Sequence, residues 1–111
     1  MKPINVSDFT EFPGPRFEKH GPFSGERFRR EILLNAIAEN AGNICINLDG
    51  VIGYGSSFLE EAFGGLIRDG IPDEIARQIA ENIVSDTDPS LKLEIQNYIQ
   101  DAIANKNKIK S

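Results

Sequence analysis

The chain has little of several residue types on which many functions depend. Its 111 residues include one cysteine, one histidine and no tryptophan. Because Cys45 is alone, an internal disulfide is excluded, and with His20 it forms no metal-binding motif of recognisable spacing. No apolar run approaches the ~20 residues that cross a bilayer. We therefore expect no metal, no cofactor and no membrane contact.

The length of the chain and the distribution of its charges narrow the class of protein further. The N-terminal sequence MKPINVSDF lacks the apolar core of a secretory signal, which predicts a cytoplasmic protein. Residues 1–30 carry six basic and four acidic side chains, residues 31–105 carry three and thirteen, and residues 106–111 add three lysines. Such an acidic body repels a phosphate backbone, so we expect no nucleic-acid ligand. We predict one domain over residues 1–105, followed by a solvated basic tail over residues 106–111.

Apolar spacing predicts a regular alternation of strands and helices. A short strand is expected in INVSDF, residues 4–9. An apolar strand covered on both faces, the expected centre of the sheet, is predicted in ICINL, residues 44–48. Between them, apolar residues at helical spacing follow Ser24, a typical N-cap, and the helix is expected to end before Gly42. The long loop of residues 12–25 precedes this helix.

The second half of the sequence continues the pattern. Ser57 and Glu60 form an S-x-x-E capping box that predicts the start of a second helix. The pair Gly64 and Gly65 inside this helix predicts a close approach of its backbone to the sheet. The remaining elements are a helix from Pro72 to about Asn82, a strand near residues 83–85, and a last helix capped by Asp88. This order indicates an α/β sandwich with a small, mostly parallel sheet and about four helices.

The glycine-rich turn DGVIGYGSS, residues 49–57, follows the apolar strand directly. In parallel sheets the functional crevice lies beyond the carboxyl ends of the strands, which is the place of this turn. The sequence of this turn matches neither the phosphate-binding loop G-x-x-x-x-G-K-[ST] nor the dinucleotide motif G-x-G-x-x-G. A nucleotide-hydrolysing or dinucleotide-binding role is therefore not indicated.

Two stretches, INLDGVIGYGSSFLEEAFGGLIR and GPFSGERFR, resemble the STAS-like family of bacterial proteins, a domain of unknown function. The resemblance runs from about residue 12 to about residue 100, in the element order expected above. It implies a STAS-like sandwich, and more distantly a likeness to the STAS domains of anti-sigma factor antagonists.

In those antagonists a D-S-[ST]-G turn is phosphorylated on its first serine by a serine kinase of the histidine-kinase-like ATPase type. The resemblance implies that Ser56 is the phosphoacceptor and Ser57 the second serine of the turn. Gly55 stands where the antagonists have aspartate, and Phe58 where they have glycine. The implied function is a small regulatory protein in signalling that contacts a protein partner through this turn.

Other roles of the same residues remain open at this point. Both serines can simply cap a helix, and Asp49 can orient a ligand or accept N–H groups in the turn. Gly50, Gly53 and Gly55 can supply positive φ angles or a contact surface, and Tyr54 is an expected exposed interface anchor.

The alternative function is a nucleotide- or other anion-binding module that combines this helix N-terminus with Arg16 and Arg27. The arginines near the long loop can equally well pair with the acidic body. No nucleophile, base and orienting group can be assigned together, so we do not expect an enzyme.

Overall fold

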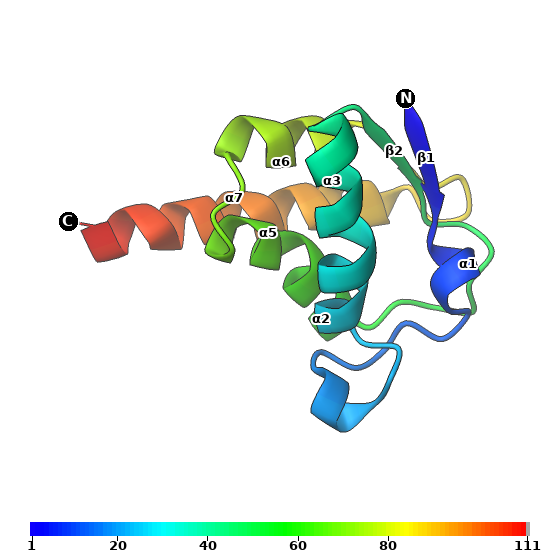
Figure 1. Ribbon diagram of the computed structural model, residues 1–111. Coiled ribbons are helices and arrows are strands. Elements are labelled where there is room, and N and C mark those ends of the chain that lie inside the picture. Colours follow the sequence, from blue (N-terminus) through cyan, green and yellow to red (C-terminus); the bar gives the residue numbers. More distant parts are fainter. Residues whose placement is uncertain (111) are drawn as a thin grey trace.

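The computed structural model describes the backbone of residues 1–110 and the side chains of residues 1–108. It contains a three-stranded parallel sheet in the order β1-β2-β3, of which Figure 1 labels β1 and β2. The strands are β1 (Lys2–Asn5), β2 (Ile44–Asn47) and β3 (Ile83–Val84). The apolar ICINL segment is the central strand, as its composition predicts. The α/β class with a parallel sheet is thereby confirmed.

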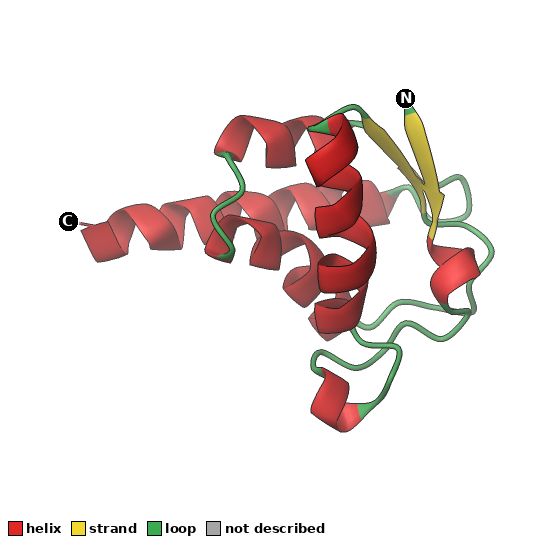
Figure 2. Ribbon diagram, viewed as in Figure 1, coloured by secondary structure: helices red, strands yellow, loops and turns green. Residues whose placement is uncertain are grey.

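Helices make up most of the remaining chain, and most of them lie on one side of the two longer strands (Figure 2). Two long helices each contain a π-helical segment, in which the turn is wider than in an α-helix. The first is α2 (Gly25–Arg27), η2 (Phe28–Leu33) and α3 (Leu34–Asn40); the second is α4 (Ser56–Leu59), η3 (Glu60–Gly64) and α5 (Gly65–Arg68). The others are α1 (Val6–Phe9), the short 3-10 helix η1 (Glu18–His20), α6 (Asp73–Glu81) and α7 (Ser90–Lys110).

Only one face of the sheet is fully covered by the helices. In β2, Ile44 and Ile46 are buried, whereas Cys45 and Asn47 between them are half-buried. Alternating side chains of a strand point to opposite faces, so the second face is partly open to solvent. The expectation that this strand is covered on both faces is therefore wrong. An apolar run indicated burial, but it did not show how many layers the domain has.

Two predicted element ends are confirmed and one is corrected. Ser24 caps the first long helix, since its Oγ accepts the N–H of Arg27 at 3.0 Å. That helix ends at Asn40, before Gly42 as expected, and the residue with positive φ after it is Ala41, at 50°. The strand expected over residues 4–9 ends at Asn5, because the chain turns there into α1.

The lack of side chains at Gly64 and Gly65, where η3 meets α5, leaves space for charged side chains rather than for the sheet. A Cβ at Gly65 would lie 2.7 Å from Cζ of Arg29, and one at Gly64 would lie 3.3 Å from Cδ of Glu60. Both distances are too short for an unshifted neighbour, so the glycines make room for charged groups. The expectation that the backbones of helix and sheet approach each other here is wrong. Instead, the charged side chains of Arg29 and Glu60 approach the helix at these glycines.

The last helix extends beyond the predicted domain boundary at residue 105. Its start is held by Asp88, whose Oδ1 accepts the N–H of Ser90 at 3.2 Å. Near its end, Nζ of Lys106 lies 2.5 Å from Oδ1 of Asp73 at the start of α6. The first of the basic residues 106–111 thus belongs to a helix and an ion pair, while the boundary itself stays a prediction.

Candidate functional site

The glycine–serine turn lies beyond the carboxyl end of β2, beside the loop that joins β3 to α7. Asp49 connects the two loops, because its carboxylate oxygens accept the N–H groups of Thr87 and Asp86, both at 3.0 Å. The bond from Thr87, and then the one from Asp86, lower the pKa of the Asp49 carboxyl below its ordinary value. Asp49 therefore accepts N–H groups, as one of its two expected roles proposes, but those of the loop before α7 rather than those of the turn itself.

A segment of the long loop runs along the turn and holds it at two points. The N–H of Ile52 donates to the carbonyl of Glu11 at 3.0 Å, and that of Gly55 to the carbonyl of Pro13 at 2.9 Å. A Cβ at Gly55 would lie 2.8 Å from the carbonyl oxygen of Gly14, so the close approach requires glycine.

The turn needs its other glycines for different reasons. Gly50 has a φ of +88°, a left-handed conformation that glycine adopts without cost. Gly53 faces open space, where a Cβ would meet nothing within 4 Å. A tight positive-φ turn is therefore confirmed for Gly50, and Gly53 has no structural need to be glycine.

Tyr54 is not the exposed anchor that the sequence analysis expects. Its hydroxyl donates to the carbonyl of Leu48 at 2.7 Å, and its half-buried ring lies 6.3 Å from the ring of Phe58. Burial, and then the charge of Asp49, raise the pKa of the Tyr54 phenol well above its usual range. A bulky aromatic next to a short turn can fold back onto the core, so the prediction of exposure is wrong.

Ser56 and Ser57 are both exposed, and the helix begins at Ser56. Gly55 occupies the N-cap position and no side chain caps the helix, so the predicted capping box of Ser57 and Glu60 is wrong. Glu60 is engaged elsewhere, by Arg16 at 2.5 Å and by Arg68 at 2.8 Å. The two strong cations outcompete a backbone N–H for the carboxylate.

Ser56 faces α7. Burial and the neighbouring Glu94 raise the pKa of Tyr98, and a hydrogen bond with Ser56 acts in the opposite direction. The charge of Glu60 contributes to the same increase. The Ser56 hydroxyl is therefore close to the phenol of Tyr98.

The two arginines expected to bind an anion are each bound by carboxylates. Besides Glu60, Arg16 contacts Glu61 at 3.3 Å. Arg27 pairs with Glu31 through its Nε and donates to a carbonyl of the long loop at 2.9 Å. The structure thus does not bring Arg16 and Arg27 together into one anion site with the turn.

Two features of this region carry no signal in the sequence. Ile52, 76% exposed at the tip of the turn, and Phe12, 66% exposed on the adjacent segment, lie on neighbouring loops. Loop residues follow no helical or strand period, so periodicity cannot predict their exposure. A crevice of about 380 Å³ is lined by residues of the turn, by residues of the loop before α7, among them Ser85, and by Leu91 at the start of α7.

The part of the chain that the structure describes contains no group of three or more His, Cys, Asp or Glu side chains that could hold a metal ion. None of its helices combines the length and the apolar character that a membrane crossing requires.

Comparison with known proteins identifies one family. No curated protein and no solved structure matches the chain significantly. The family described as a STAS-like domain of unknown function (DUF4325) matches residues 24–89. This match covers more than half of the chain, from the cap of the first long helix through the glycine–serine turn to the start of α7. By that match, the chain belongs to the STAS-like domain family.

Proposed function

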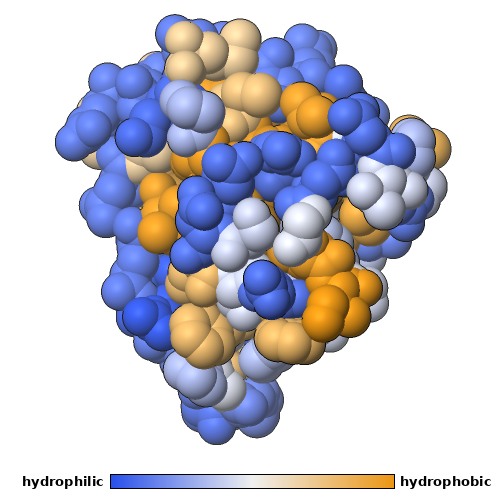
Figure 3. All heavy atoms as spheres, turned by 90° about the vertical axis from the view of Figure 1, so that its right-hand side faces the viewer, coloured by the Kyte–Doolittle hydropathy of each residue, from blue (hydrophilic) through white to orange (hydrophobic). Residues whose placement is uncertain are grey.

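We propose that this chain is a small regulatory module that binds a protein partner through the turn of residues 50–58. The observation that carries the proposal is the pair of exposed apolar side chains, Ile52 and Phe12, on loops joined by a backbone hydrogen bond. Single exposed apolar residues are common, but neighbouring ones at the carboxyl edge of a parallel sheet are typical of a contact surface. The face that carries the strands and these loops shows apolar surface among polar groups (Figure 3).

The proposed switch is phosphorylation of Ser56 by a partner kinase of the histidine-kinase-like ATPase type. The side chain is exposed at the start of a helix, beside Glu60 and Tyr98. A phosphate adds roughly two negative charges and would repel the Glu60 carboxylate next to it. Because Arg16 and Arg68 bind that carboxylate, the added charge would compete for both arginines and change the surface offered to the partner.

The proposed activity is binding, without chemistry of its own. The anion-binding alternative is less favoured, because Arg16 and Arg27 already neutralise carboxylates. A thermal-shift series with nucleotides separates the two functions, since a ligand that binds the folded state raises the melting temperature by mass action. A concentration-dependent rise with any nucleotide would favour the alternative.

The decisive experiment is affinity purification from the native host, with phosphopeptide analysis of the same sample. A stoichiometric ATPase-like partner, lost with Ile52→Asp, would support the contact surface. Leu93→Asp is the matched control, because Leu93 is also exposed, at 60%, but lies on α7 and does not line the crevice at the turn. Equal partner recovery with Ile52→Asp and wild type would contradict the proposed surface.

The switch is tested separately in the same assay. Ser56→Asp should release or retain the partner differently from Ser56→Ala, because only the first variant adds charge. If both variants bind the partner equally and no phosphate is found on Ser56, the switch is refuted while the contact surface stands.

A further inference from the structure

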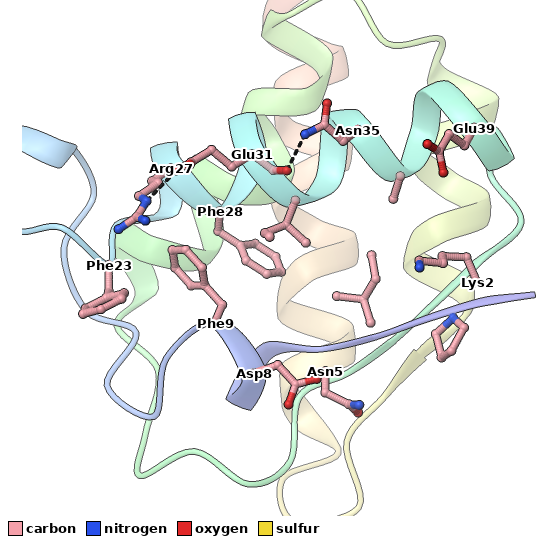
Figure 4. Close-up of a pocket in the computed structure, with 14 residues that line it drawn as sticks. Lys2, Asn5, Asp8, Phe9, Phe23, Arg27, Phe28, Glu31, Asn35 and Glu39 are labelled. Carbon is pink, nitrogen blue, oxygen red and sulfur yellow. Dashed lines mark hydrogen bonds and ion pairs between the residues drawn. The ribbon is translucent and has the colours of Figure 1, made fainter.

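A second surface lies on the side of the domain formed by β1 and the first long helix. A groove of about 550 Å³ runs between the strand and the helix, and every residue of β1 lines it (Figure 4). It includes none of residues 50–58, so what it binds does not depend on the function proposed for the turn. The other lining residues come from α1, from the loop before α2, and from the helix itself: Asp8, Phe9, Phe23, Arg27, Phe28, Glu31, Ile32, Asn35, Ala36 and Glu39.

One wall of the groove is an open sheet edge. Among the described residues, β1 pairs only with β2, so its outer edge has no neighbouring strand. The N–H of Lys2 donates to the carbonyl of Asn43, which shows that Lys2, and by alternation Ile4, direct their main-chain groups toward β2. Pro3 and Asn5 therefore direct theirs outward. Pro3 offers only its carbonyl, and Asn5 offers an N–H, so one acceptor and one donor are available to an added strand.

The other wall and the closed end of the groove are apolar and aromatic. The ring of Phe9 lies 5.4 Å from that of Phe28 and 5.6 Å from that of Phe23. Phe28 is fully buried and belongs to the core, whereas Phe23 is 44% exposed. The guanidinium of Arg27 lies 5.6 Å from both the Phe9 and the Phe23 ring centroids, and so keeps the exposed ring in place. The aromatic end is thus preformed.

The rim of the groove is acidic. The guanidinium of Arg27 is bound by the Glu31 carboxylate and by a loop carbonyl. Asp8 and Glu39 have no side-chain partner in the part of the chain that the structure describes. Besides Arg27, one cation lines the groove, namely Lys2. A ligand with a basic side chain would therefore gain attraction along this rim.

We propose that this groove is a docking site for an extended peptide segment of a partner protein. The segment adds to the edge of β1, accepting the N–H of Asn5 and donating to the carbonyl of Pro3. An open edge strand facing a helix across an apolar groove is the arrangement used by domains that bind peptides by strand addition. Apolar side chains of the segment pack between Phe23 and Ile32, and a basic side chain pairs with Asp8 or Glu39.

The test is selection of binding peptides from a phage-displayed library of random peptides, followed by fluorescence anisotropy with the selected synthetic peptide. Selected peptides should alternate apolar residues and carry a basic one. Asn5→Pro removes the outward N–H, which makes no bond to β2, and Phe23→Glu charges the aromatic end. Each variant should weaken binding about tenfold. Leu93→Glu, at an exposed apolar position of α7, is the matched control and should bind like the wild type.

A measurement on the wild-type protein tests the proposal even if the variants do not fold. Amide chemical shifts of the wild type, titrated with the selected peptide, should change in β1, η2 and α3. The proposal is overturned if no selected peptide binds, if the shift changes fall on residues 50–58 instead, or if folded Asn5→Pro and Phe23→Glu bind as tightly as the wild type. The second of these results would assign the peptide to the turn and leave its proposed function intact.

Discussion

Replacement of Arg29 by methionine should destabilise the domain by about 3 kcal/mol, at the lower end of the range for breaking a buried ion pair. The side chains of Arg29 and Glu61 are only 11% and 9% exposed, and their charged atoms lie 2.7 Å apart. Arg29 also binds Asp69 at 2.8 Å. Its loss leaves the Glu61 carboxylate buried, with only the longer contacts to Arg16, 3.3 Å, and Arg68, 3.5 Å, as compensation.

Urea unfolding at neutral pH, followed by circular dichroism, measures this loss directly. The double variant Arg29→Met with Glu61→Leu should recover most of the stability, because an apolar pair of similar volume replaces a buried ion pair at little cost. Arg30→Met is the matched control, since Arg30 is 53% exposed and its pair with Glu18 should contribute nothing measurable. The reasoning would be refuted if the double variant were as unstable as Arg29→Met, or if Arg29→Met unfolded like Arg30→Met.

Three further predictions concern the turn. Tyr54→Phe removes the hydrogen bond to the Leu48 carbonyl and should lower the free energy of unfolding by about 1 kcal/mol in the same urea assay. The pKa of Asp49 is lower in the folded than in the unfolded chain, so its stabilisation is present above the unfolded pKa and is lost as the pH falls through the folded one. Asp49→Asn should therefore flatten the acid limb of the stability curve below about pH 4, and an unchanged limb would contradict this assignment. Gly55→Ala places a Cβ 2.8 Å from the Gly14 carbonyl oxygen, which should separate the two loops and cost about 1–3 kcal/mol. Hydrogen exchange of the residue 55 amide should then accelerate; protection equal to that of the wild type would show that the loops adapt.

Much of the fold follows from local patterns in the sequence. The apolar segment of residues 44–48 was expected as the central strand and is central. Ser24 was expected to cap the first long helix and does so. Pro72 precedes α6, and Asp88 holds the start of α7, at the places where proline and aspartate favour helix starts. These features are local, because each depends on a few neighbouring residues.

The errors lie where side chains find contact partners that no local sequence pattern predicts. Glu60 was expected to cap its own helix through Ser57, but Arg16, which is 44 positions away, binds it instead. Tyr54 was expected to be exposed, and it turns inward because the Leu48 carbonyl offers an acceptor. The pair Gly64 and Gly65 was expected to approach the sheet, and it makes room for Glu60 and Arg29 instead. In each case a tertiary contact is stronger than the local preference.

The sequence by itself determined the order of strands and helices, the parallel class of the sheet and the position of the glycine–serine turn beyond its central strand. These follow from hydrophobic period, turn residues and the short connections that the chain allows. Only the tertiary structure decided which charges pair, which aromatic rings are exposed, and that β1 leaves an edge open beside a groove. The reason is physical: the partner of a charge and the exposure of a ring depend on atoms that folding brings together from distant parts of the chain.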